Sequence, residues 1–151
     1  MVLQPLTVRA VASADFNEWE PLWKGYNRFY GRPDFPTGIT QMTWSRFFDS
    51  YEPVYALVAE RAGRLVGLAH YLLHRSTILV EPICYLQDLY TDEFARKSGV
   101  GRKLIEAVYV EAQNAGCHRV YWQTHETNMA AIALYDKVAD RSGFVVYRKN
   151  L

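Results

Sequence analysis

The sequence has few cysteines, no long hydrophobic run and almost no excess of charge of either sign. Its only cysteines, Cys84 and Cys117, cannot make a disulfide framework or a zinc ligand set. No segment reaches the roughly 18 apolar residues of a membrane helix, and Arg9 interrupts the stretch where a signal peptide would be apolar. Seventeen Lys and Arg against sixteen Asp and Glu leave a charge of +1, whereas nucleic-acid-binding proteins are usually basic. We therefore expect a cytoplasmic protein that binds neither membranes nor nucleic acid.

The composition is that of a folded domain. Half of the residues are hydrophobic and 15% are aromatic, which is too apolar for a disordered chain. No linker, repeat or low-complexity segment divides the sequence. Because domains typically hold roughly 100–200 residues, we expect a single domain over residues 1–151.

The first third of the sequence predicts a strand followed by two helices. The strand is expected at residues 7–11. Asp15 stands three residues before Glu18, which is the spacing of a capping box at the start of a helix. Apolar side chains then recur every three or four residues as far as Tyr30, which is helical periodicity. A second short helix is expected at residues 41–49.

The remaining sequence predicts a mixed sheet. Residues 54–61 and 64–76 form an antiparallel pair around a tight turn at Ala62–Gly63. The further elements are a strand at 84–91, a helix from Val100 to Gly116, a strand at 119–124, a helix that Asn128 caps and Gly143 ends, and a closing strand at 144–147. Since a strand, a crossover helix and the next strand imply parallel neighbours, we predict an α/β fold. Antiparallel N-terminal strands precede a parallel strand–helix–strand unit.

The loop before the long helix is a candidate polyphosphate site. Its sequence, Arg96-Lys97-Ser98-Gly99-Val100-Gly101, ends where the helix starts, so unpaired N–H groups and the positive end of the helix dipole face a ligand. Arg102 and Lys103 add two more cations. A solvated basic helix start is the alternative interpretation. The Walker pattern is absent, and the dinucleotide fingerprint is incomplete because Leu104 replaces its third glycine.

Together these patterns resemble the GNAT superfamily of acetyl-CoA-dependent N-acetyltransferases. The resemblance covers about residues 53–147 and rests on the strand at 85–91, the Arg96-x-x-Gly99-x-Gly101 loop and the downstream Asn128, Tyr135 and Gly143-Phe144. Residues 134–144 look like the branch that acetylates polyamines, lysine-like amino acids or histone-type amines. The resemblance therefore implies a transferase that moves acetyl from acetyl-CoA directly to a primary amine of a small molecule or peptide. It also implies a homodimer and no metal.

The resemblance also assigns roles to individual residues of the cofactor site. The backbone amides of Arg96, Lys97, Ser98, Gly99, Val100, Gly101 and Arg102 would hold the pyrophosphate of CoA. Leu89 and Thr91 would pair with the pantetheine arm, and the N–H groups near Leu89 and Tyr90 would face the oxyanion. Asn128 would orient the cofactor near its pantetheine.

For catalysis the resemblance names Tyr135 as the acid that protonates the departing thiolate. Polyamine-acetylating relatives usually carry Glu as the base where this chain has Gln87, and glutamine accepts no proton. Asp88, if a bulge re-aims it, and Glu126 are the substitutes. The acceptor would lie between the first two helices and the strand after Pro82. Its expected lining is Tyr26, Tyr30 and Trp44, with Asp34, Asp49 or Glu81 attracting the amine.

Two other functions stay open from the sequence. The Gln87 departure is compatible with a CoA-binding or regulatory module that has lost catalysis. The glycine loop is also compatible with an NAD-binding enzyme. His70 and His74 stand four apart without a third metal ligand, so we expect half-buried histidines without a metal.

Overall fold

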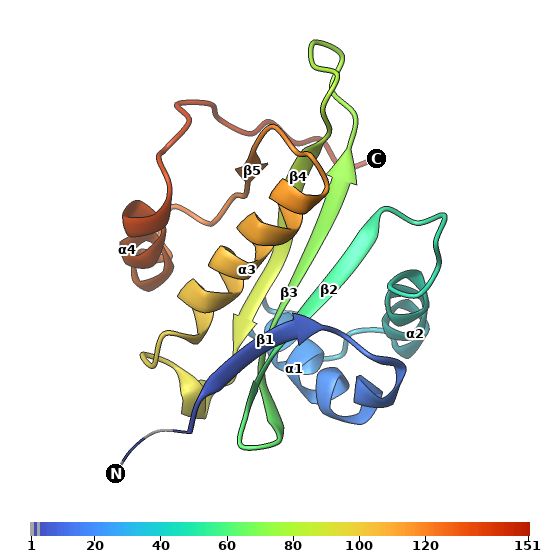
Figure 1. Cartoon of the computed structure of the whole chain (residues 1–151), viewed down its shortest axis with the longest axis vertical. Coiled ribbons are helices and arrows are strands. Elements are labelled where there is room, and N and C mark those ends of the chain that lie inside the picture. Colours follow the sequence, from blue (N-terminus) through green and yellow to red (C-terminus); the bar gives the residue numbers. More distant parts are fainter. Residues whose placement is uncertain (1, 3) are drawn as a thin grey trace.

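The computed structural model describes residues 2 and 4–151, and it contains a five-stranded sheet covered by helices on both faces (Figure 1). The strands are β1 (Leu6–Ala10), β2 (Val54–Arg61), β3 (Arg64–His74), β4 (Ile83–Thr91) and β5 (Val120–Tyr121). The helices are α1 (Phe16–Phe29), α2 (Thr37–Arg46), α3 (Val100–Asn114) and α4 (Met129–Val138), with 3-10 turns at Ser13–Asp15 and Glu93–Ala95. None of these helices has both the length and the hydropathy of a membrane span.

The strand order is β1-β2-β3-β4-β5, with antiparallel pairs up to β4 and a parallel β4–β5 pair. This confirms the predicted mixed sheet. The β2–β3 hairpin turns at Ala62 and Gly63, whose φ angles of 53° and 72° are both positive. Positive φ at both central residues is the requirement of the tight turn whose twist matches a hairpin.

Two apolar clusters fill the two sides of the sheet. Leu57 and Ala59 of β2 point toward α3, while Val58 between them points toward α1. The predicted stripe on α3 is confirmed, because its buried positions are Val100, Leu104, Ile105, Val108 and Ala112. The helix ends as predicted: Gly116 takes a φ of +74°, and the Cys117 amide donates back to the Ala112 carbonyl.

A bulge in β4 changes which face its side chains occupy. His70 of β3 is opposite Asp88, but the next residue, Tyr71, is opposite Leu86, so Gln87 is the extra residue. One inserted residue reverses the alternation of the strand. Asp88 therefore turns toward α1, where it bonds to His70, and Leu89 turns toward α3.

The predicted capping box does not form. Asp15 is the N-cap of α1, but its carboxylate accepts the Ala12 amide at 2.7 Å and the Arg9 guanidinium at 2.7 and 3.0 Å. Glu18 accepts the amide of Leu65 at 2.9 Å. Partners from β1 and the β2–β3 hairpin have replaced the local helix bonds.

Several predicted boundaries are wrong, chiefly after β5. β5 has two residues, α2 starts at Thr37, and α4 ends at Val138, well before Gly143. The predicted strand at 144–147 is absent, since the structure shows no helix or strand in residues 139–151. Phe144 and Tyr147 are 91% and 93% exposed. An apolar run becomes a strand only beside a hydrogen-bonding neighbour, and the short β5 offers little edge.

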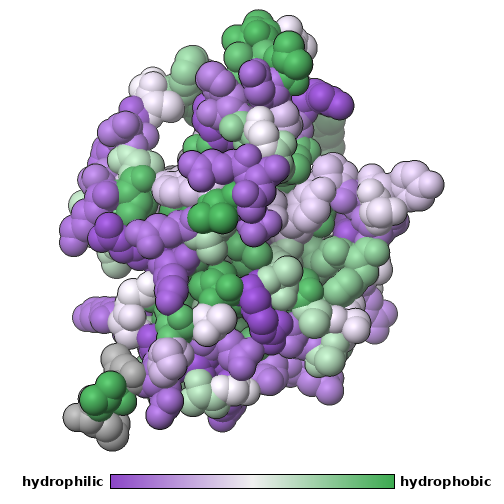
Figure 2. All heavy atoms as spheres, in the orientation of Figure 1, coloured by the Kyte–Doolittle hydropathy of each residue, from purple (hydrophilic) through white to green (hydrophobic). Residues whose placement is uncertain are grey.

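The surface has an apolar tip at the loop that joins β3 and β4 (Figure 2). Ile78 and Val80 in this loop are 86% and 90% exposed. The tip lies at the opposite end of the sheet from the start of α3 (Figure 1), so it is remote from the glycine loop.

Candidate active site

Strands β4 and β5 part soon after they meet. Their register pairs Cys84 with Val120 and Tyr85 with Tyr121 and stops there, although β4 continues to Thr91. Within residues 2 and 4–151, no strand covers this edge of β4 beyond Tyr85. Backbone groups along such an edge are available to an extended ligand.

The glycine loop joins this edge of β4 to α3. Gly99, the N-cap of α3, has a φ of +83°, and a Cβ placed there would meet nothing within 4 Å. The first backbone bond of the helix runs from the Lys103 amide to the Gly99 carbonyl at 3.1 Å. The preceding amides, from Val100 to Arg102, therefore have no intrahelical acceptor and form the positive end of the helix dipole. This geometry suits an anion.

The side chains of the loop are less available than the sequence suggests. Ser98 accepts a hydrogen bond from Arg61 at 3.0 Å and donates one to the Ala95 carbonyl, so its hydroxyl supports the loop. Arg102 pairs with Glu106 at 2.9 Å.

Of the other basic side chains near the loop, two have partners within the protein and one has none. Lys103 donates to the Leu6 carbonyl. Arg96 donates to the Thr91 carbonyl at 3.2 Å and lies over the rings of Phe29 and Tyr90. Lys97 makes no hydrogen bond or ion pair with any described residue. Its side chain is therefore free to meet a phosphate.

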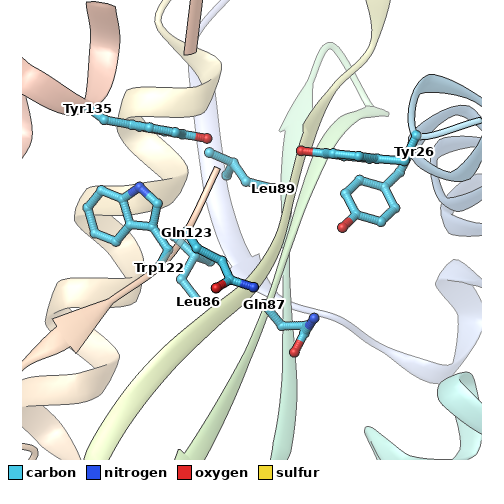
Figure 3. A pocket seen from close by; sticks show the side chains of 8 residues that line it. Tyr26, Leu86, Gln87, Leu89, Trp122, Gln123 and Tyr135 are labelled. Atoms are coloured by element: carbon cyan, nitrogen blue, oxygen red, sulfur yellow. The ribbon is translucent and has the colours of Figure 1, made fainter. Parts of the chain in front are cut away.

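A pocket lies beside the bare edge of β4, between α1 and α4. Its lining comes from α1 and the residue after it (Tyr26, Tyr30), β4 (Leu86, Gln87, Leu89), the segment after β5 (Trp122, Gln123) and α4 (Tyr135). Tyr26 and Tyr135 lie on either side of Leu89 (Figure 3). The structure thus brings together four of the predicted residues: Leu89, Tyr135, Tyr26 and Tyr30.

Other predicted residues lie elsewhere. Trp44 packs against Phe16 and Trp19, at ring-centroid distances of 5.2 and 4.8 Å. Glu126 is exposed in the loop before α4 and does not line the pocket. Asn128 is the N-cap of α4, but its side chain donates to Thr124 Oγ1 at 3.3 Å instead of capping the helix.

The predicted acidic side chains for the amine are also outside the lining. Asp34, Asp49 and Glu81 are exposed and do not contribute to the pocket. The side chain of Tyr90 fills space at α1, since a Cβ on Gly25 would come within 2.5 Å of its hydroxyl. The Tyr90 side chain is therefore directed toward α1, and only the backbone of this residue is available at the edge of β4.

The pocket tyrosines hold their protons firmly. Burial raises the pKa of Tyr135 to about 12, with a smaller effect of the neighbouring Tyr30. Burial also raises the pKa of Tyr26, and the negative charge of Asp88 raises it further. Both hydroxyls are protonated at neutral pH and can donate hydrogen bonds or a proton.

Asp88 is a buried carboxylate that acts on Tyr26 and Tyr30 but does not itself line the pocket. His70 Nδ1 lies 2.9 Å from Asp88 Oδ2, and the indole N–H of Trp19 donates to His70 Nε2 at 3.0 Å. Because an indole N–H only donates, Nε2 of the neutral imidazole accepts and Nδ1 carries the hydrogen that Asp88 accepts.

Three residues of this region differ from what the sequence predicts. His70 is not half-buried as expected: it is 2% exposed and bonded to Asp88. A histidine inside an otherwise apolar strand was the available signal, but its partner depends on the bulge. Trp122 and Gln123 enter the pocket because β5 ends before them.

Among the described residues, no group of three or more His, Cys, Asp and Glu side chains suits a metal ion.

Two proteins named as N-acetyltransferases are similar to this chain over almost its whole length. The D-amino-acid N-acetyltransferase HPA3 of Saccharomyces cerevisiae is 39% identical over 152 positions, which cover 99% of this chain and 94% of that protein. The uncharacterized N-acetyltransferase YhfO of Bacillus subtilis is 27% identical, with 97% and 98% covered.

A solved aminoglycoside N-acetyltransferase in complex with CoA superposes with a TM-score of 0.82 at 16% identity, covering 97% of this chain and 95% of that one. At that identity the likeness concerns the fold. The model of the acetyltransferase (GNAT) family matches residues 18–139, most of the chain. The chain therefore belongs to the acetyltransferase (GNAT) family of acyl-transferring enzymes.

Proposed function

We propose that this enzyme transfers the acetyl group of acetyl-CoA to a primary amine. One observation carries the proposal: the bare edge of β4 leads directly into the glycine turn at the start of α3, with the tyrosine-lined pocket beside it. An extended arm that ends in a diphosphate matches this path. The pocket then receives the end of the arm that bears the acetyl group.

The residues present fit CoA. Gly99 opens the turn outward, the amides from Val100 to Arg102 offer donors, and the side chain of Lys97 has no competing partner among the described residues. Leu89 and Thr91 lie on the bare edge and would pair with the pantetheine through their backbones. When bound, acetyl-CoA supplies an activated acetyl thioester.

The chain's own residues then handle two protons. An amine of the lysine type has a pKa near ~10.4 and must lose a proton before its nitrogen bonds to the acetyl carbon. We assign the base to Asp88, because its carboxylate acts on Tyr26 of the pocket wall, while Glu126 is exposed. As the carbon–sulfur bond breaks, Tyr135 gives the sulfur its proton, and backbone N–H groups near Leu89 and Tyr90 face the oxyanion.

An amino acid is the acceptor that the relatives favour. Polyamines, lysine-like amino acids and peptide amines all carry the required primary amine. The yeast relative, which matches almost the whole chain, is named for acetylating D-amino acids. This supports an amino-acid acceptor over a polyamine.

We also propose that the enzyme is a homodimer in which residues 144–147 pair with a second copy. This segment carries four exposed apolar side chains and has no strand partner among the described residues. β5 ends the sheet, so its outer edge is open. Each copy thus offers an unpaired apolar segment and the outer edge of β5. Light scattering of the whole chain and of a Val145→Glu, Val146→Glu double variant tests this, and a monomeric unaltered chain contradicts it.

The test of the catalytic proposal is thiol release with acetyl-CoA over a panel of primary amines, together with binding titrations of CoA and NAD. We expect CoA binding and turnover of at least one amine. CoA binding without turnover of any amine would indicate a binding or regulatory module. Binding of NAD but not CoA would indicate a nucleotide-dependent enzyme instead.

A further inference from the structure

The loop after α1 carries an arginine whose position is fixed by a buried partner. Arg32 Nε donates to Asn27 Oδ1 at 3.0 Å, and the Arg32 amide donates to the Asn27 carbonyl at 2.8 Å. Asn27 is 1% exposed and is itself held by a bond from its side-chain amide to the Trp23 carbonyl at 2.9 Å. A buried asparagine thus orients an exposed guanidinium.

Three aromatic rings support the same guanidinium. Its central carbon lies 5.9 Å from the ring centroid of Tyr26, 5.7 Å from that of Tyr30 and 5.9 Å from that of Phe35. Contacts at this range are attractive for a cation over a π face. Tyr26 and Tyr30 also line the pocket, so Arg32 lies against the walls of the proposed acceptor site.

The terminal amino groups of Arg32 are free. Within residues 2 and 4–151, its two Nη atoms make no hydrogen bond and no carboxylate lies within ion-pair distance. With Nε occupied and the plane fixed, the remaining donors are arranged for a planar acceptor such as a carboxylate.

A negative group also acts on the same tyrosines. Asp88 raises and Arg32 lowers the pKa of both Tyr26 and Tyr30, whose largest shift comes from burial, so both charges act on these hydroxyls. Two opposite charges therefore act on these wall tyrosines from outside the pocket lining: the Asp88 carboxylate suits an ammonium group, and the Arg32 guanidinium suits a carboxylate. An α-amino acid carries both charges on one carbon, whereas a polyamine would bring a second cation toward Arg32.

We infer that the acceptor is an amino acid with a free carboxylate next to its reactive amine, and that Arg32 binds that carboxylate. This inference rests on the proposed acetyltransferase function. Arg32 determines the substrate class, while Asp88 and Tyr135 serve any amine that reaches them. The amino-acid side chain is left to point away from both charges.

Pairs of substrates test the inference. Glycine, D-alanine, L-alanine, D-phenylalanine and L-lysine are each compared with their primary amides, which keep the amine and lose the negative charge. The measurements are kcat/KM with acetyl-CoA for the unaltered enzyme, Arg32→Gln and Arg32→Lys. Arg28→Gln, which changes an exposed arginine of α1, is the matched control. Calorimetric binding of acid and amide in the presence of CoA gives a second readout.

We expect Arg32→Gln to lower kcat/KM for the acids by about 10- to 100-fold and that for the amides by less than about twofold, as for the loss of a charge-assisted pair. Arg32→Lys restores part of the loss, and Arg28→Gln changes neither. Because each acid is compared with its own amide across variants, differences in amine pKa cancel.

One result overturns the inference alone: equal losses of kcat/KM for acids and for amides in Arg32→Gln. The absence of turnover with every acid and amide, despite CoA binding, overturns the proposed function and this inference with it.

Discussion

His70 and Asp88 form a buried pair, with Nδ1 and Oδ2 2.9 Å apart where β3 faces the bulge of β4. Trp19 occupies the other ring nitrogen of His70, which fixes the ring and its tautomer. His70 thus links Trp19 of α1 to Asp88, the proposed base.

Replacing His70 with Ala should reduce kcat and leave the KM for acetyl-CoA unchanged. Asp88 would lose the hydrogen bond that holds its carboxylate in place, so the proposed base would no longer be positioned to take the proton of the amine. His70→Asn, whose side-chain amide can donate to Asp88 from the Nδ1 position, should restore part of kcat. Unchanged kcat in His70→Ala, or no rescue by His70→Asn with both proteins folded, would contradict a positioning role.

Tyr135→Phe should lower kcat with little change in acetyl-CoA affinity, because it removes a proton donor and keeps the ring. The usual contribution of a general acid is about 10²–10⁴-fold, and we expect the lower end here. Since burial raises the pKa of Tyr135 to about 12, its own ionisation should not limit the rate below about pH 10. Stopped-flow thiol release measures the step. Full turnover in Tyr135→Phe would remove the residue from the mechanism.

Gly99→Ala and Gly116→Ala make a matched pair at the two ends of α3. Both glycines have positive φ, +83° and +74°, and a Cβ added at either position would meet no other atom within 4 Å. The cost of each substitution is therefore backbone strain alone, about 1 kcal/mol of unfolding free energy. Only Gly99→Ala should weaken CoA binding, because it disturbs the phosphate turn.

A second variant separates charge from strain at this turn. Gly101→Asp places a carboxylate at the proposed diphosphate site, so acetyl-CoA binding should fall by at least about tenfold. Calorimetry with CoA measures all three variants. Equal CoA affinity in Gly99→Ala and Gly116→Ala, or intact uptake by Gly101→Asp, would move the cofactor away from this turn.

Asp15→Asn should remove stability in a pH-dependent manner. The bonds from Arg9 lower the pKa of Asp15 below its usual value, so the carboxylate stabilises the folded state at neutral pH. That contribution is lost as the pH falls through the folded-state pKa, below about 4. The pair is partly exposed, so the expected loss at pH 7 is at most about 1 kcal/mol. Melting curves of the two proteins should converge near pH 3, and a constant difference would contradict this.

Periodicity accounts for most of what the sequence predicted about the fold. The stripe of α3 and the two-sided apolar strands β2 and β3 follow from which residues must be buried together. The turn at Ala62–Gly63 and the end of α3 at Gly116 follow from local backbone chemistry. These features depend on few distant contacts.

The missed features depend on distant partners. The Asp15 carboxylate accepts a hydrogen bond from Arg9 of β1, and the Ser98 hydroxyl accepts one from Arg61 of β2. No local sequence pattern predicts these contacts. The same holds at the candidate site. The bulge decides that Asp88 faces His70, and Arg32 takes its role from a buried asparagine in the last turns of α1.

The early parting of β4 and β5 has one more consequence. With acetyl-CoA along Leu89 and Thr91 as proposed, the cosubstrate would take the place of a missing strand and would be recognised through the peptide backbone. Side chains along this edge would then be free to vary during evolution without loss of recognition. A proline, which would remove an amide, is the substitution that the edge should not tolerate.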